Sequence, residues 1–150
     1  MIVSRSASDS RNASDPPGWA VDTSVAVPAL DSSHAAHLAC RRIAQARRPS
    51  LAGHAAFETF SVLTRLHGPL SIAAPTASAA IALAFPDRSW LSPKQQMRLL
   101  ERMGEIGIAG GMVYDALVGE AARQDGRTML TRDARAIRTY DLLGVRYELV

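Results

Sequence analysis

The chain has 150 residues, one cysteine, and 17 Lys and Arg against 14 Asp and Glu, which gives a formal net charge of +3. This length predicts one domain with a core that needs no disulfide, and a lone cysteine excludes an internal one. The positive excess, almost all arginine, permits nucleic-acid binding without requiring it. No segment resembles a transmembrane helix or a signal peptide, so we expect no membrane association and a cytoplasmic location.

The first 18 residues are rich in Ser, Asp and Arg and end in Pro16-Pro17-Gly18. They contain almost nothing to bury, so we expect a flexible tail over 1–18, or a true translation start nearer Trp19. The predicted domain covers residues 19–150.

From Trp19 onward, short apolar runs alternate with amphipathic stretches. The apolar runs predict strands that end at Asp22 and cover 49–52, 88–91, 128–131 and 145–150. The amphipathic stretches predict helices over 24–30, 34–48, 53–66, 75–85, 92–103, 111–124 and 134–143. This alternation predicts an α/β fold, a three-layer α/β/α sandwich around a short, mostly parallel sheet.

Local signals refine several of these helices. Thr23 or Ser24 is expected to cap the first helix, and Ser92 with Pro93 to begin the fifth. The Gly-rich segment 104–111 reads as a connector, because it lacks the Lys-Ser/Thr ending of a phosphate loop. The inner side of helix 34–48 is expected to carry Ala36, Ala39, Cys40, Ile43 and Ala46.

The fourteen acids fall into two groups. Ten lie in polar loops or on helix faces that read as solvated: Asp9, Asp15, Asp31, Asp87, Glu101, Glu105, Glu120, Asp125, Asp141 and Glu148. Four instead interrupt or end an apolar segment: Asp22, Glu58, Asp115 and Asp133. Since ligand sites in parallel sheets form outside the carboxyl ends of the strands, all four are expected to face one crevice.

Clustered carboxylates repel one another, and a divalent cation removes that penalty. Hard oxygen ligands favour Mg²⁺ or Mn²⁺, with water and a substrate phosphate completing the coordination. The four acids are therefore predicted to be both the metal ligands and the catalytic groups of a metal-dependent nuclease. Ser24 and Thr131 supply hydroxyls suited to hydrogen bonds around that site.

With these residues in order, the chain resembles the PIN-domain family, and specifically the toxin ribonucleases of VapBC toxin–antitoxin pairs. The resemblance runs from about Trp19 to Val150 and is carried by Val21-Asp22-Thr23-Ser24, Glu58 within 57–66, 114–118 around Asp115, and Leu130-Thr131-Arg132-Asp133. The chain departs from the family pattern in its tail and in Ile137, which stands where an aromatic often follows the fourth acid.

The resemblance implies an endoribonuclease dependent on Mg²⁺ or Mn²⁺ that cuts transfer or ribosomal RNA. It also implies a homodimer, and a cognate antitoxin whose tail lies along an apolar groove and obstructs the site. By motif match, Asp22, Glu58 and Asp115 are the principal acids and Asp133 is the more variable fourth.

Other side chains carry weaker predictions. Arg65, two turns after Glu58, is either an RNA phosphate contact or a solvated arginine. The pair His34 and His37 has helical metal spacing but no third ligand, so a partly exposed helix start is favoured. Helix 53–66 has more apolar residues than one buried face requires. The surplus is assigned to a dimer or antitoxin surface.

Three other readings compete with a nuclease. A receiver-like phosphoacceptor domain needs a paired acid in its first loop and a late lysine, and the chain has neither. A phosphatase with an Asp nucleophile needs a second Asp at position 24. A PIN fold that binds RNA or a partner without cutting fits less well, because all four acids are present.

Overall fold

The computed structural model describes residues 18–150, and the predicted tail lies outside the described residues except for Gly18. Within this range five strands form one sheet, and every neighbouring pair is parallel. The strands are β1 Trp19–Val21, β2 Ser50–Ala52, β3 Arg88–Ser89, β4 Thr128–Thr131 and β5 Tyr147–Leu149.

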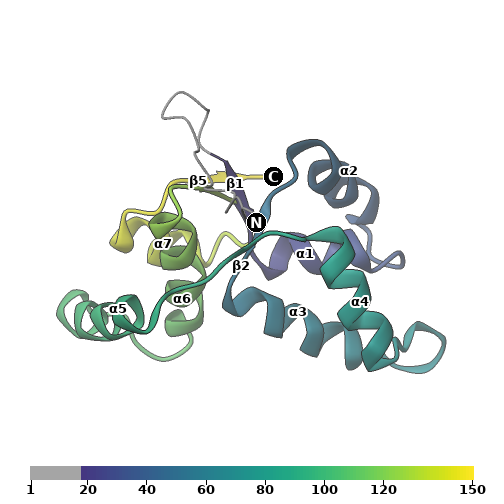
Figure 1. Cartoon of the computed structure of the whole chain (residues 1–150), viewed down its shortest axis with the longest axis horizontal. Helices are drawn as coiled ribbons and strands as arrows, with labels where there is room; N and C mark the ends of the chain where they lie inside the picture. The colour runs from purple at the N-terminus through teal and green to yellow at the C-terminus, as the bar shows by residue number, and fades with distance from the viewer. Residues whose placement is uncertain (1–17) are drawn as a thin grey trace, which may run out of the picture.

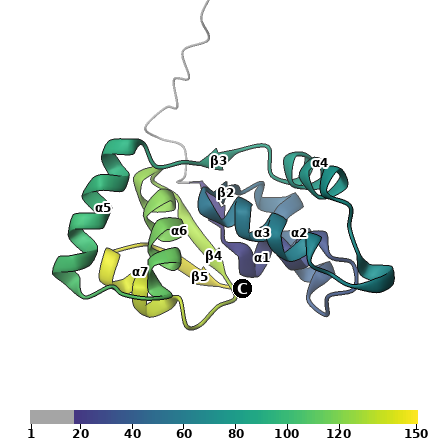
Figure 2. The ribbon, with the colours of Figure 1, turned by 90° about the horizontal axis from the view of Figure 1, so that it is seen from below.

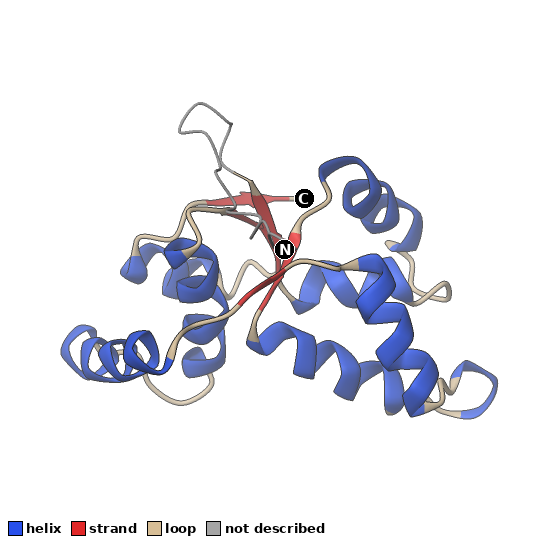
Figure 3. Cartoon of the chain, in the orientation of Figure 1, coloured by secondary structure: helices blue, strands red, loops and turns tan. Residues whose placement is uncertain are grey.

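Seven α-helices of the described range flank this sheet, with α1 to α4 on one side and α5 to α7 on the other (Figures 1 and 2). They are α1 Thr23–Leu30, α2 His37–Arg47, α3 His54–Thr64, α4 Ala74–Ala84, α5 Pro93–Ile106, α6 Met112–Gln124 and α7 Ile137–Leu143, with one 3-10 turn, η1, at Gly68–Leu70. Figure 3 shows the strands as a thin layer between the helices, which confirms the predicted three-layer α/β/α fold. None of the described helices combines the length and apolarity needed to cross a membrane.

The strand order β3-β2-β1-β4-β5 places a switch point beside β1. From β1 the chain first builds outward through β2 and β3, then returns to pair β4 with the other edge of β1. Val21 lies opposite Leu130 in that pairing, so the residues that follow each strand emerge together at the carboxyl end. Crevices at such a switch point are the usual ligand sites of open α/β sheets.

The central strands are buried on both faces, as their uninterrupted apolar runs require. Val21, Leu51 and Leu130 are fully buried, and Phe85 and Leu63 pack into the same core from the helical layer. One edge of the sheet is β3, as predicted, although this strand covers two residues where 88–91 was expected, and the other edge is β5.

The starts of α1 and α7 differ from prediction because the side chain of a preceding Asp bonds to the backbone at each of these starts. The expected cap of α1 by Thr23 or Ser24 is wrong, since the Asp22 side chain is the cap and accepts from the Ser24 backbone N–H at 3.0 Å. In the same way, α7 begins at Ile137 rather than at residue 134. Asp133 accepts from the Arg135 backbone N–H at 2.9 Å and holds residues 134–136 in a preceding turn.

The predicted start of α5 at Ser92 and Pro93 is confirmed, and the structure adds a capping box in which Ser92 and Gln95 are bonded reciprocally. This helix continues to Ile106, and the left-handed Gly107 ends it, so the Gly-rich connector is shorter than predicted. Helix α2 begins at His37 rather than at residue 34, and its inner side is narrower than predicted. Cys40 is buried and Ile43 is half-buried, whereas Ala39 and Ala46 face solvent.

The prediction of a solvated Glu120 is wrong. Its side chain is only 4 % exposed and lies on the face of α6 that packs against α5. Arg123 binds both of its carboxylate oxygens at 2.7 Å, Gln124 donates to it at 2.7 Å, and Arg102 reaches it from α5 at 3.9 Å. A buried carboxylate requires such partners, and here they come from helical spacing and from a neighbouring helix.

Candidate active site

Asp22 is the most buried of the four predicted acids, with an exposed fraction of 6 %. Its Oδ1 accepts from the Ser24 backbone N–H at 3.0 Å and from the Ser24 hydroxyl at 2.5 Å. Its Oδ2 accepts from the Tyr140 hydroxyl at 3.0 Å. Burial raises the pKa of Asp22, and the hydrogen bonds from Ser24 and Tyr140 offset part of that rise.

Glu58 lies in the second turn of α3 and points back toward the start of α1. The Thr23 hydroxyl donates to Glu58 Oε2 at 2.6 Å, and His54 Nε2 lies 3.8 Å from Oε1. Consecutive hydroxyls therefore hold two different acids, because Thr23 binds Glu58 while Ser24 binds Asp22.

Asp115 occupies the first turn of α6 and is half-buried. Burial and then the nearby negative charges of Asp133, Asp22 and Glu58 raise its pKa to about 6, with Arg135 opposing them. Like charges act in this way only over short distances. Asp22 and Asp133 follow the neighbouring strands β1 and β4, and the Thr23 hydroxyl joins Glu58 to the start of α1. Asp115 lies near enough to these three acids for their charges to act on it.

Asp133 follows β4 and differs from the other three acids in having a cation beside it. Arg135 Nε lies 3.2 Å from Asp133 Oδ1 and its Nη2 lies 3.4 Å from Oδ2. Burial raises the pKa of Asp133, but the bonds from Arg135 outweigh burial and hold it below its ordinary value. The Arg135 side chain is 92 % exposed and is free to turn toward solvent.

Ser24 and Thr131 join the two strand ends beside Asp22. Their hydroxyl oxygens lie 3.4 Å apart, and the Arg132 backbone N–H donates to the Ser24 hydroxyl at 2.7 Å. The Asp133 backbone N–H donates to the Thr131 hydroxyl at 3.1 Å. These bonds fix the loop after β4 relative to Asp22.

Arg65 is not brought to this crevice. It follows the last turn of α3, two turns and about 10 Å along the helix from Glu58. Its Nε donates to the Ser61 carbonyl at 3.2 Å, and its side chain is exposed.

Sequence reasoning missed four residues that touch the acids, namely Thr23, His54, Arg135 and Tyr140. Tyr140 had a detectable signal, since it belongs to an apolar stripe with Ala136 and Leu143 at helical spacing. The partners of Glu58 and Asp133 had no such signal in the sequence, because these contacts depend on side-chain directions that residue spacing does not specify.

The carboxylate oxygens of the crevice are ligands that suit a hard divalent cation. Among the described residues, no group of three or more His, Cys, Asp or Glu side chains lies close enough together to hold a metal ion as the side chains stand. Burial is the main cause of the raised pKa of Asp115, the charges of the other three acids add to it, and Arg135 opposes them. An open set of carboxylates is what Mg²⁺ uses when waters and a substrate phosphate supply the other ligands.

Comparison with known proteins agrees with this architecture. The family model described as PIN domain matches residues 20–142. The chain therefore belongs to the PIN-domain family.

Two relatives within that family come from Mycobacterium tuberculosis. The chain is 43 % identical over 129 residues to Ribonuclease VapC27 of strain H37Rv, a match that covers 86 % of this chain and 94 % of the relative. It is 42 % identical over 132 residues to Ribonuclease VapC40 of strain CDC 1551, a match that covers 87 % of this chain and 98 % of the relative. The family assignment removes the receiver-like and phosphatase alternatives.

Proposed function

We propose that this protein is the ribonuclease toxin of a toxin–antitoxin pair and hydrolyses phosphodiester bonds in cellular RNA, with transfer or ribosomal RNA as the target. The observation that carries the proposal is the convergence of Asp22, Glu58, Asp115 and Asp133 at the switch point of the sheet. The names of the two relatives support the same reaction. Such a substrate places the protein in the cytoplasm.

Asp22, Glu58 and Asp115 would hold a Mg²⁺ or Mn²⁺ ion, with Asp133 as the fourth acid. When bound, such an ion supplies positive charge for the phosphate and acidity for an attacking water. Ser24 and Thr23 keep Asp22 and Glu58 turned toward the crevice through short hydrogen bonds. The Asp115 carboxyl releases its proton near neutral pH, so it becomes an anion where the ion binds.

The principal test compares wild-type protein with Asp22→Asn in an RNA cleavage assay with Mn²⁺ or Mg²⁺. We expect the variant to lose about 100-fold or more, because even outer partners of a metal site change activity by 10- to 100-fold. Glu101→Gln is the matched control, since Glu101 is an exposed acid of α5 away from the crevice. Equal cleavage by wild type and Asp22→Asn would contradict the site, and cleavage that persists in EDTA would contradict the metal. RNA that is bound but never cut would support the binding-module alternative.

Arg65 is proposed to contact RNA phosphate at the rim rather than at the scissile bond, given its distance from the acids. Arg65→Gln should weaken RNA binding uniformly across sequences and reduce the salt dependence by about one charge. A change in the cleavage rate at saturating RNA would instead place Arg65 at the reaction itself.

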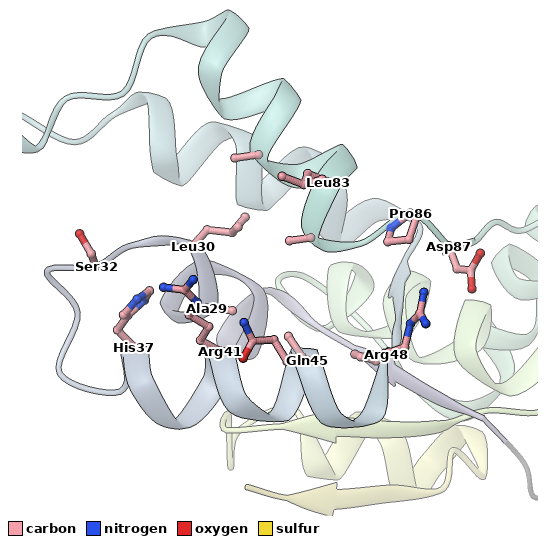
Figure 4. Close-up of a pocket in the computed structure, with 14 residues that line it drawn as sticks. Ala29, Leu30, Ser32, His37, Arg41, Gln45, Arg48, Leu83, Pro86 and Asp87 are labelled. Atoms are coloured by element: carbon pink, nitrogen blue, oxygen red, sulfur yellow. The ribbon is translucent and has the colours of Figure 1, made fainter.

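The antitoxin is assigned to a groove of about 700 Å³ between α1, α2 and α4 (Figure 4). Leu30 and the exposed Leu83 supply apolar walls, and Arg41 and Arg48 supply positive charge. An apolar segment with acidic side chains matches this groove. Helix α3 contributes no residue to it, so its surplus apolar side chains are assigned to the dimer instead.

The groove is tested by Arg41→Glu, which should weaken neutralisation by the antitoxin while RNA cleavage is unchanged. Arg42→Glu is the control, because Arg42 is exposed on the same helix but does not line the groove. Equal neutralisation of both variants would place the antitoxin elsewhere.

A homodimer is proposed to form through an exposed aromatic face. Phe57 is 63 % exposed and its ring meets Trp90 at 5.8 Å, while His54 stacks on Tyr114 at 5.3 Å. Exposed apolar patches of this kind mark interaction surfaces. Phe57→Ser should yield monomers in light scattering, whereas Leu38→Ser, which removes an exposed leucine on α2, should not. A monomeric wild type would contradict the dimer.

A further inference from the structure

The Tyr140 side chain connects the last helix of the fold to the first acid of the candidate site. It is 1 % exposed and lies on α7, yet its hydroxyl donates to Asp22 Oδ2 at 3.0 Å across 118 residues of chain. Burial and the charge of Asp22 both raise the pKa of this hydroxyl, so it stays a neutral hydrogen-bond donor.

Helix α6 carries a glycine where the Tyr140 ring passes. A Cβ built on Gly119 would lie 2.8 Å from Tyr140 Cδ1, 2.9 Å from Cε1 and 3.1 Å from Val145 Cγ2. Glycine in a helix interior is unfavourable compared with alanine, so its presence calls for a close approach. Gly119 therefore leaves the space that lets the Tyr140 hydroxyl reach Asp22.

The two oxygens of Asp22 are engaged unequally. Oδ1 accepts two hydrogen bonds from Ser24, which match its two lone pairs, whereas Oδ2 accepts the one from Tyr140. Oδ2 is thus the oxygen with more capacity left for a cation, and Tyr140 determines its direction.

We propose that Tyr140 is a positioning residue of the candidate metal site, which orients Asp22 Oδ2 toward the bound cation, and that Gly119 is required for it. The inference rests on the proposed function, because it assumes that Asp22 is a metal ligand.

The test measures Mn²⁺ affinity of the full chain by calorimetry, together with the unfolding temperature in EDTA. Tyr140→Phe keeps the ring and removes only the hydroxyl. We expect Mn²⁺ to bind about tenfold more weakly, as for other partners that orient metal ligands. Tyr147→Phe is the matched control, since its ring lies 6.2 Å from that of Tyr140 but its hydroxyl interacts with Asp141 instead of with the four acids of the crevice. A purely structural role for Tyr140 would lower the unfolding temperature and leave Mn²⁺ affinity unchanged.

Gly119→Ala provides a second, independent variant. It retains the hydroxyl but displaces the ring, so it should also weaken Mn²⁺ binding, and Tyr140→Phe added to it should weaken binding little further. Affinity within twofold of wild type for either folded single variant would overturn the inference, as would an equal loss in Tyr147→Phe. A wild type that does not bind Mn²⁺ would overturn the metal site and this inference together, whereas a wild type that binds and variants that match it would overturn the inference alone.

Discussion

Asp115 and Glu120 lie five residues apart on α6, yet their carboxylates meet opposite surroundings. Their positions are about 140° apart around the helix, so one faces the crevice and the other faces α5. Burial would raise the pKa of both. For Glu120 the bonds from Arg123 and Gln124 outweigh burial and lower its pKa, whereas for Asp115 three neighbouring acids add to burial and raise its pKa to about 6.

The difference separates an acid that is paired within the fold from one that we propose to be a metal ligand. Glu120 has its partners within the protein, and removing them would leave an isolated buried charge. Asp115 has no hydrogen-bond donor directed at it among the residues that the structure describes, and its neighbours repel it. Unfavourable electrostatics of this kind in a crevice identify functional groups better than burial does.

The largest expected effect is on activity. Asp115→Asn should reduce RNA cleavage with Mn²⁺ by about 100-fold or more, because it removes a charged ligand from the proposed site. Glu120→Gln should retain cleavage within about twofold, measured at a temperature where the protein is folded. Similar losses in both variants would erase the distinction between the two acids.

The second effect is on stability and falls on the other acid. Glu120→Gln should lower the free energy of unfolding by about 2 kcal/mol, less than for fully buried pairs because Arg123 and Arg102 are partly exposed. Urea unfolding monitored by circular dichroism measures this change. A loss below roughly 0.5 kcal/mol would show that the partners of Glu120 hold an ordinary surface charge.

The third effect concerns pH. Between about pH 4 and pH 6 folded Asp115 keeps a proton that the unfolded chain has released, so its contribution to stability falls as the pH rises. Glu120 has the opposite sign, because its lowered pKa gives stability that is lost as the pH falls. In EDTA at pH 7, Asp115→Asn should therefore be more stable than wild type by about 1 kcal/mol, discounted for solvent screening, or roughly 3 °C. The two proteins should converge at pH 4, and a constant difference across this range would contradict the assignment.

The smallest effect concerns the cation beside Asp133. Arg135→Gln removes an exposed positive charge that competes with a metal ion, so Mn²⁺ affinity should increase by about two- to fivefold. Calorimetric titration at constant ionic strength measures it, with Arg138→Gln, an exposed arginine of α7, as the control. Weaker binding in Arg135→Gln would indicate that Arg135 supports the site rather than opposing the ion.

The sequence predicted the fold because its strands are short apolar runs with clear limits, and 128–131 matches β4 residue for residue. Topology predicts that Asp22 and Asp133 lie together, since both follow neighbouring parallel strands at the carboxyl end of the sheet. Glu58 and Asp115 were expected beside them because each lies in the first two turns of its helix. Their roles as ligands remain a prediction.

The partners of the acids required three-dimensional information. Glu120 was assigned to solvent because helical spacing does not reveal the approach of Arg102 from α5. Tyr140 was missed because nothing in its sequence neighbourhood points to Asp22, 118 residues away. Gly119 is a sequence signal for this contact, since a glycine inside a regular helix often marks the close approach of another side chain.

The switch point also sets the order in which the site is completed during synthesis. Asp22 directly follows β1, but the second neighbour of that strand, β4, is made more than a hundred residues later, and Tyr140 later still. At roughly 5–20 residues per second, this interval lasts about 5 to 20 seconds. The ribosome making this proposed ribonuclease is therefore exposed only to an incomplete crevice until almost the whole chain has been made.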